Sequence, residues 1–150
     1  MTDHRYETHL QWTGSTGLGW ESYDRAHTAL APPAEQEIRL TTGESKGDPA
    51  ILNPEQLLVM AASSCQMLMF LHVASKARVD VVAYEDEATG LMPVEDGWIT
   101  EITLRPRIVV AGDASEERLQ NLVETAHEHC YIANTLKSEM KIEATFEVPA

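Results

Sequence analysis

Cysteine is scarce in this chain, and basic residues are outnumbered by acidic ones. The 150 residues include only two cysteines, which is too few for a fold built on disulfide bonds. Lysine and arginine together number 11 against 24 aspartates and glutamates, for a formal net charge of −13. A nucleic-acid-binding domain is expected to carry a basic stripe. We therefore expect no nucleic-acid partner and no attachment to anionic membranes, and we assign the acidic excess to solubility.

The sequence also lacks a long uninterrupted run of apolar residues. Its longest apolar stretch, around residues 57–73, is broken by Ser63, Ser64, Cys65, Gln66 and His72. This pattern predicts a buried helix rather than a membrane span. The first twelve residues are polar and lack the basic-then-apolar pattern of a signal peptide. We therefore expect a cytoplasmic location, where a pair of cysteines is more often reactive than structural.

Length and composition predict a single domain spanning residues 1–150. The hydrophobic content of 43% and the charged content of 23% are ordinary for a globular protein with a real core. Runs bounded by turn residues predict strands, and they occupy residues 5–12, 20–30, 35–42, 79–92, 98–110 and 141–148. A central helix and a second helix interrupt this series, so we predict an α+β fold.

Capping signals mark where both helices begin. Asn53 as N-cap, Pro54 at the first helical position and Gln56 at the capping-box position predict a helix that runs to about Ala77. Nearly every face of this helix is apolar, which predicts burial on all sides and hence a subunit interface. The second helix is expected to open at Asp113, with Glu116 completing its capping box. Its apolar stripe consists of Leu119, Leu122, Val123, Ala126, Cys130 and Ala133.

The two cysteines are the candidate reactive groups. Cys65 lies mid-helix among small polar residues that a core helix does not need, and buried polar groups require partners. Cys130 has His127 and His129 beside it. If both cysteines face one core, a sulfenic acid on one can condense with the other to a disulfide. The alternative is a pair of inert, buried structural cysteines.

A metal site is the competing use of the residues around Cys130. His127, His129 and Cys130 are close in sequence, but helical positions two apart face different ways. The chain contains neither a CxxC nor an HExxH pattern. We therefore expect no metal.

Thiol chemistry also needs a group that favours the thiolate. Cys65 is about three turns beyond Asn53, too far for the helix dipole to help, so an arginine is required. Arg25 and Arg39 are the candidates in the N-terminal strands, and each could instead be a simple surface residue. Glu55 could hold such an arginine in a bidentate pair. It lies ten residues before Cys65, about 15 Å along a helix, so the arginine would have to span between them.

Two segments resemble signatures of the OsmC/Ohr family of hydroperoxide-detoxifying proteins. They are NPEQLLVMAASSCQMLMFL at residues 53–71 and AHEHCYIANTL at residues 126–136. The resemblance covers essentially the whole chain and favours a divergent OsmC-like branch. One departure is Tyr131, which follows Cys130 where family members often have proline.

The resemblance implies a fold, an assembly and a reaction. The fold is the OsmC-like α+β fold, in an intertwined homodimer whose two sites lie at the subunit interface. Cys65 would be the peroxidatic cysteine and Cys130 the resolving one, with Glu55 positioning an activating arginine, for which Arg25 is our choice and Arg39 the alternative. The substrates would be organic hydroperoxides, including those of fatty acids. An external dithiol, in some members of lipoyl type, would reduce the disulfide, and no cofactor would be bound.

A second function class stays open on the same scaffold. A redox sensor or small-ligand-binding protein would form the same disulfide but turn over slowly or not at all. A structural dimer with inert thiols is a third possibility. Multiple turnovers with a dithiol would favour the enzyme, and stoichiometric oxidation without recycling would favour the sensor.

Overall fold

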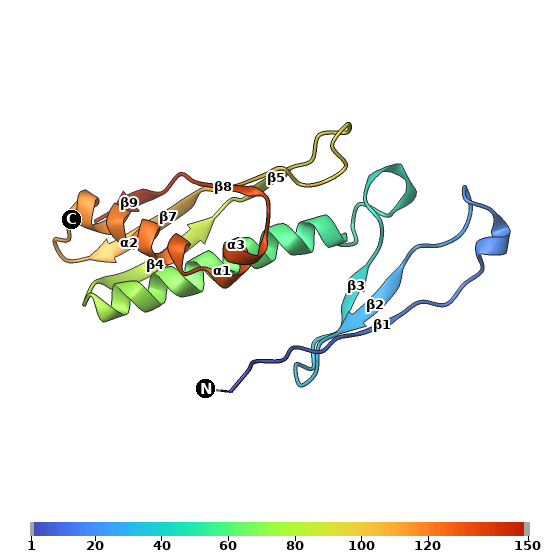
Figure 1. The fold of residues 1–150 in the computed structure, drawn as a ribbon, viewed down its shortest axis with the longest axis horizontal. Helices are drawn as coiled ribbons and strands as arrows, with labels where there is room; N and C mark the ends of the chain where they lie inside the picture. The colour runs from blue at the N-terminus through green and yellow to red at the C-terminus, as the bar shows by residue number, and fades with distance from the viewer. Residues whose placement is uncertain (1, 149–150) are drawn as a thin grey trace. The chain divides into compact units, whose positions relative to one another are not determined.

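The computed structural model describes residues 2–148, which divide into two compact units, one ending at Leu57 and the other beginning at Leu58. The order of the elements along the chain can be followed by colour in Figure 1. Strands, a long helix, more strands, two further helices and final strands succeed one another. The predicted α+β class is confirmed. The assignment of residues 1–150 to a single domain stays a prediction, and each unit is described by itself.

The first unit is built on a three-stranded antiparallel sheet in the order β1-β2-β3. Its elements are β1 His9–Gln11, the 3-10 helix η1 Thr16–Leu18, β2 His27–Leu30, β3 Ile38–Leu40 and the 3-10 helix η2 Glu44–Lys46. The three predicted strands are therefore present but shorter than expected. Beyond β3, the amide of Thr41 donates to the carbonyl of Leu52 at 2.8 Å. This bond ties the start of the long helix to the sheet.

The second unit carries six strands in two three-stranded sheets, β4-β7-β9 and β5-β6-β8. They are β4 Asp80–Asp86, β5 Thr89–Leu91, β6 Glu101–Leu104, β7 Pro106–Ala111, β8 Glu139–Ile142 and β9 Thr145–Glu147. The pairs β4/β7 and β5/β6 are antiparallel, whereas β6/β8 and β7/β9 are parallel. Parallel pairing requires a crossover, and the segment with the second helix supplies it.

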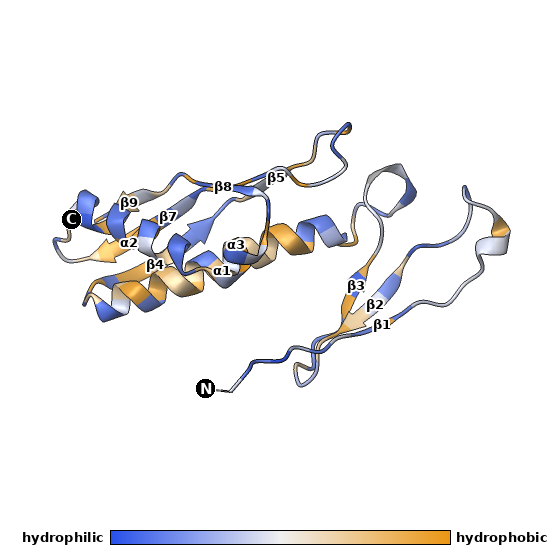
Figure 2. Cartoon of the chain, in the orientation of Figure 1, coloured by the Kyte–Doolittle hydropathy of each residue, from blue (hydrophilic) through white to orange (hydrophobic). Residues whose placement is uncertain are grey.

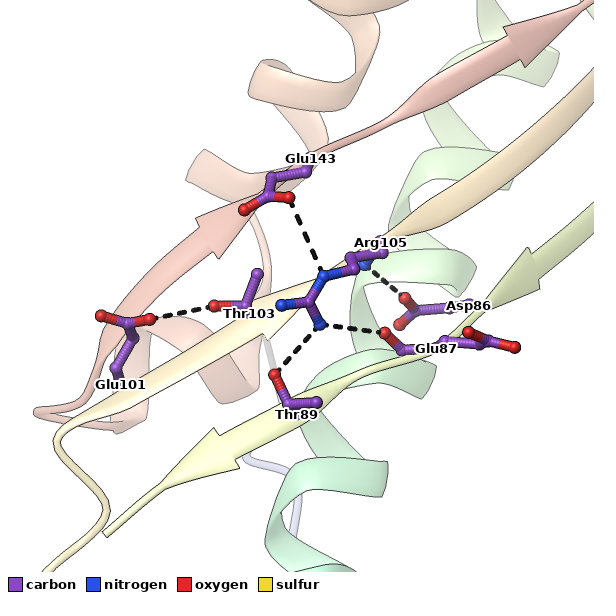
Figure 3. Close-up of polar contacts among 7 residues, drawn as sticks. All are labelled: Asp86, Glu87, Thr89, Glu101, Thr103, Arg105 and Glu143. Atoms are coloured by element: carbon purple, nitrogen blue, oxygen red, sulfur yellow. Dashed lines mark hydrogen bonds and ion pairs between the residues drawn. The ribbon is translucent and has the colours of Figure 1, made fainter. Parts of the chain in front are cut away.

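Each of the last three predicted strand segments is divided into two strands. At one of these breaks, the amide of Arg105 lies between β6 and β7 and donates to the carboxylate of Asp86 at 2.6 Å. Figure 3 shows this bond together with the contacts of the Arg105 side chain to Thr89 and Glu143. The Asp86 carboxylate thus accepts a hydrogen bond from a backbone amide that, in a continuous strand, would donate to a neighbouring strand. The alternation of apolar and polar residues in the sequence could not reveal such a break.

Helix α1 spans Pro54–Lys76 and confirms the predicted start and end. The amide of Gln56 donates to Asn53 Oδ1 at 2.8 Å, and the amide of Asn53 donates to Gln56 Oε1 at 3.0 Å. These two bonds are the predicted capping box. At the other end, Arg78 adopts a φ of 59° and the amide of Val79 donates to the carbonyl of Ala74. This is a Schellman motif in which arginine takes the position usually held by glycine.

The single chain buries only one side of α1, and the prediction of burial on all sides, which includes a subunit interface, stays a prediction. One stripe at four-residue spacing is buried, and it consists of Ala62, Gln66, Phe70 and Ala74. On the opposite side Leu68 is 60% exposed and Met60 is 46% exposed. Figure 2 shows the apolar character continuing along the helix. By length and a mean hydropathy of 1.8 over 18 residues, α1 could cross a membrane. Its buried stripe, however, packs against other elements of the second unit.

Two apolar clusters hold the second unit together. In the first, Phe70 and Ala74 of α1 pack with residues of β7 and of the second helix, namely Ile108, Val110, Leu119, Val123 and Ala126, and with Val79. The second cluster joins Ala62 of α1 to Ile102 and Leu104 of β6. Figure 1 shows α1 and α2 alongside the same sheet. The core therefore lies between α1, α2 and the strands.

The second helix, α2, spans Glu116–Glu128 and differs from its prediction at both ends. Its N-cap is Ser115, whose hydroxyl accepts from the amide of Arg118 at 3.2 Å, so Asp113 is not the cap. Its last residue is Glu128, so Cys130 does not lie on its stripe. Cys130 has an extended backbone and is instead the N-cap residue of the short helix α3, Tyr131–Thr135. Burial of Cys130 was predicted correctly, but its position on the second helix was not.

Candidate functional site

Cys65 and Cys130 are brought together within the second unit. Cys65 is a partly buried residue of α1, next in sequence to Gln66 of the buried stripe. Cys130 is 0% exposed, and its thiol lies near enough to Cys65 for Cys65 to influence its pKa. Both cysteines are free thiols. Residues far apart in the sequence thus form one thiol pair, as the disulfide hypothesis requires.

The surroundings of the pair make the two thiols unequal. Burial raises the pKa of Cys130, and its interaction with Cys65 raises that pKa further. The backbone amides of Ala133 and Ile132 point toward the sulfur and oppose this rise, but the net pKa shift is upward. Cys130 therefore stays protonated to higher pH than an ordinary cysteine. This is suitable for a thiol that reacts second.

Two polar residues around Cys65 make hydrogen bonds to other elements, but one buried oxygen of Gln66 does not. Ser63 donates its hydroxyl hydrogen bond to Oδ2 of Asp86, and Gln66 donates from Nε2 to the carbonyl of Val123 at 3.2 Å. The other amide atom, Gln66 Oε1, is buried and has no hydrogen-bond partner within residues 2–148. The polar interruption of α1 thus connects the helix to β4 on one side and to α2 on the other.

Tyr84 and Asp86 are site residues that the sequence interpretation missed. Both belong to β4 and are partly buried. The ring of Tyr84 packs on Phe70, with centroids 5.9 Å apart and planes tilted by 46°. Burial raises the pKa of Tyr84 far above its usual range, and the charges of Asp86 and Cys130 add to this effect. The available signal was the two-residue spacing that places both side chains on one face of a strand.

The histidines near Cys130 contribute in different ways. The amide of Cys130 donates to the carbonyl of His127 at 3.2 Å, while His129 Nδ1 lies 2.8 Å from the carbonyl of Thr125. Nδ1 of His127 is buried and finds no partner in the part of the chain that the structure describes. His127 also lines a cavity of about 310 Å³ between α2 and β8. The histidine side chains thus bond to the backbone or face this cavity.

The other predicted site residues lie in the first unit. The Arg25 guanidinium donates to the carbonyls of Trp20 at 2.6 Å and Tyr23 at 2.7 Å, and it stacks over the Tyr23 ring at 3.7 Å. Arg39 is exposed on β3. Glu55 is exposed in the first turn of α1. Their roles toward Cys65 stay predictions.

Comparison with known proteins agrees with this fold. Residues 46–145 match the family described as OsmC-like protein, a segment that includes α1 and both cysteines. The uncharacterized protein YmaD of Bacillus subtilis is 23% identical over 156 residues, covering 99% of this chain and 98% of YmaD. Neither comparison names a reaction.

Solved structures are also similar over nearly the whole chain. An OsmC-like protein of unknown function from Vibrio cholerae has a TM-score of 0.84 and 28% identity, covering 95% of this chain and 100% of its own. An organic hydroperoxide resistance protein OsmC from Legionella pneumophila has a TM-score of 0.69 and 15% identity, covering 99% and 100% of the two chains. At 15% identity, the similarity to the Legionella protein shows a shared fold and no more. With two thirds of its length matched by the family, the chain belongs to the OsmC-like proteins.

Proposed function

We propose that this protein is a thiol-dependent peroxidase that reduces organic hydroperoxides through Cys65 and Cys130. The observation that carries the proposal is the pair of neighbouring free thiols, one of them fully buried. Membership of the OsmC-like family supports it, as does the fold shared with a protein named for organic hydroperoxide resistance. The low identity to that protein makes a direct experiment necessary.

The proposed cycle has three steps. The Cys65 thiolate attacks a peroxide oxygen, the O–O bond breaks, and the alcohol leaves with a proton, so Cys65 becomes a sulfenic acid. Cys130 then attacks the Cys65 sulfur, forming the disulfide and releasing water. An external dithiol, which we expect to be of lipoyl type, reduces the disulfide by exchange and becomes oxidised itself. The cycle uses no bound cofactor.

The difference in burial supports the order of the two cysteines. A peroxide must reach the sulfur that attacks it, and Cys65 is only partly buried whereas Cys130 is 0% exposed. The raised pKa of Cys130 keeps it a neutral thiol next to Cys65. We therefore propose Cys65 as the peroxidatic cysteine and Cys130 as the resolving one.

We further propose that Arg25, held by Glu55, favours the Cys65 thiolate, with Arg39 as the alternative. A guanidinium can pair with a carboxylate and still direct donors to a thiolate. Replacing the activating arginine by alanine should slow oxidation of Cys65 by about 100-fold. The matched pair Arg25→Ala and Arg39→Ala, compared by the rate of Cys65 oxidation, identifies it. Near-normal rates of Cys65 oxidation in both variants would show that neither arginine activates Cys65.

We also propose that the protein acts as a homodimer in which α1 of each subunit packs against the partner. The support is the face of α1 opposite the buried stripe, where Leu68 is exposed in the single chain. Leaving such apolar surface in water is unfavourable by about 25 cal/mol per Å². A second copy would also complete the burial of α1 that its sequence predicts.

A redox sensor or small-ligand-binding protein is the second candidate function. The observation that favours it is the cavity of about 310 Å³ between α2 and β8, which the peroxidase cycle does not use. Such a protein would form the same disulfide once and would not be recycled efficiently. Turnover is therefore the measurement that separates the two functions.

The deciding experiment is mass spectrometry of the native protein after one equivalent of cumene hydroperoxide or of hydrogen peroxide. We expect rapid loss of two hydrogens through a Cys65–Cys130 disulfide, faster with the organic peroxide, and complete reversal by dihydrolipoamide. Repeated cycles with excess peroxide and dihydrolipoamide would support the enzyme. Oxidation without recycling would support the sensor, and two unmodified thiols would reject the thiol chemistry and leave ligand binding as the function to test.

A further inference from the structure

The cavity of about 310 Å³ lies between one side of α2 and one face of β8. Its α2 residues are spaced three and four apart, as on one side of a helix, and they are Gln120, Val123, Glu124, His127 and Glu128. Its β8 residues, Met140 and Ile142, are two positions apart and so share one face of the strand. Small-molecule sites have volumes of about 300 to 1,000 Å³. The cavity therefore has the size for a small organic molecule.

The charged groups of this cavity are acidic. Glu124 and Glu128 are one helical turn apart, and neither carboxylate has an ion-pair partner among the residues that the structure describes. On β8, Lys141 lies between the two lining residues and therefore on the other face of the strand, where its ammonium pairs with Glu101 at 2.7 Å. The described lining contains no lysine or arginine. Its charge thus attracts cations and repels anions.

Two buried polar atoms near the same turn of α2 have no hydrogen-bond partner within residues 2–148, namely Nδ1 of His127 and Oε1 of Gln66. Gln66 is 1% exposed, and its Nε2 donates to the carbonyl of Val123, which lines the cavity as His127 does. Native proteins pair nearly all buried polar atoms, so an unpaired one calls for a functional explanation. An amide oxygen only accepts, and an imidazole nitrogen accepts in one tautomer. Like the two carboxylates, these atoms suit a ligand that donates hydrogen bonds.

The rest of the lining is apolar and aliphatic. Val123 is 2% exposed, and Met140 and Ile142 are partly buried against the second apolar cluster. A methionine side chain adapts its shape to what packs on it, so this wall can accommodate an alkyl chain. No phenylalanine, tyrosine or tryptophan is among the described lining residues. A quaternary ammonium would therefore lack the aromatic faces that usually bind it, and the lining favours an ammonium that carries N–H groups.

We propose that the cavity between α2 and β8 binds a primary alkylammonium, the protonated form of an amine with a short apolar chain. The ammonium donates its N–H groups to the carboxylates of Glu124 and Glu128. The alkyl chain lies against Val123, Met140 and Ile142. This inference rests on the second candidate function, for which it names the class of ligand. It does not depend on the chemistry of the two thiols.

The test is a titration of the isotope-labelled protein with hexylammonium chloride, followed by the NMR shifts of its backbone amides. We expect saturable shifts concentrated in α2 and β8, with a dissociation constant of about 1 mM or lower. Methylammonium lacks the chain and should bind about 10-fold more weakly or worse. Hexyltrimethylammonium keeps the charge and the chain but has no N–H group, and it should also bind about 10-fold more weakly. Hexanoate has the opposite charge and should cause no saturable shift at this cavity.

Two double variants distinguish this site from a general attraction of cations to an acidic protein. Glu124→Gln with Glu128→Gln removes both carboxylates of the cavity and should weaken hexylammonium binding about 10-fold or more. Glu116→Gln with Glu117→Gln removes the same charge from the first turn of α2, outside the cavity lining, and should leave the dissociation constant within about twofold. Equal losses in the two double variants would mean general charge attraction only, and that result would overturn the proposal.

Failure of this inference and failure of the proposed function give different results. If hexylammonium at about 10 mM shifts no resonance of α2 or β8, or if hexanoate binds there equally well, the alkylammonium site is wrong. The peroxidase proposal is unaffected by either result, because it is tested by oxidation of Cys65. Conversely, two unreactive thiols in a protein that binds hexylammonium at this cavity would reject the peroxidase and retain the ligand site.

Discussion

Replacing Cys65 by serine is expected to abolish hydroperoxide reduction, lowering turnover by about a thousandfold or more. A serine hydroxyl is not ionised near neutral pH and cannot form a sulfenic acid, so the first step of the cycle has no nucleophile. The measurement is consumption of cumene hydroperoxide with dihydrolipoamide as the reductant. Ser64→Ala, one residue earlier on an exposed position of α1, is the matched control and should keep normal turnover.

Cys130→Ser completes this first prediction because it removes only the second thiol. This variant should consume about one equivalent of hydroperoxide per site and then stop, since no disulfide can form. Cys65 should proceed to the sulfinic acid, which mass spectrometry detects as a gain of two oxygen atoms. If Cys65→Ser retains turnover, or if Cys130→Ser cycles at the normal rate with the dithiol, the assigned roles are wrong.

Replacing Leu68 by glutamate is expected to separate the proposed dimer. Leu68 is 60% exposed in the single chain, on the side of α1 opposite the buried stripe. If that side packs against a second copy, the substitution places an unpaired carboxylate on each side of the interface. The dissociation constant should rise by about 100-fold or more, which corresponds to roughly 3 kcal/mol. Sedimentation equilibrium should then detect the 16.7 kDa chain rather than a species of twice that mass.

The matched control for this second prediction is Val94→Glu. Val94 is 96% exposed in the turn between β5 and β6, so the same added charge should leave the mass unchanged. A monomeric unmodified protein would contradict the proposed assembly. A Leu68→Glu variant as firmly dimeric as the original would place the interface elsewhere.

The sequence alone located the elements whose signals are local. The capping box of Asn53 and Gln56 depends on residues three apart, and it predicted the start of α1 correctly. The signatures around Cys65 and Cys130 indicated the family through residue order and spacing, and the family match agrees. The start of the second helix was predicted two residues early because Asp113 and Ser115 are both good N-caps. The sequence does not show which of the two caps the helix, whereas the hydrogen bond from the Arg118 amide to the Ser115 hydroxyl does.

Contacts between distant parts of the chain were decided only by the tertiary structure. The parallel pairing of β6 with β8 and of β7 with β9, the break at Arg105, and the pairing of Ser63 with Asp86 join segments with no local signal for one another. The position of Cys130 at the start of α3 likewise follows from where α2 ends, and the apolar stripe continued past that point.

The division between the two kinds of information has a physical reason. Caps, turns and periodicity arise from neighbours along the chain, so the residue order determined the two longer helices and most strands and indicated the two candidate cysteines. Burial, hydrogen bonds and charge interactions between remote residues depend on packing. The thiol contact, the raised pKa of Cys130 and the inward face of Tyr84 and Asp86 therefore emerged only when α1, α3 and β4 were placed together.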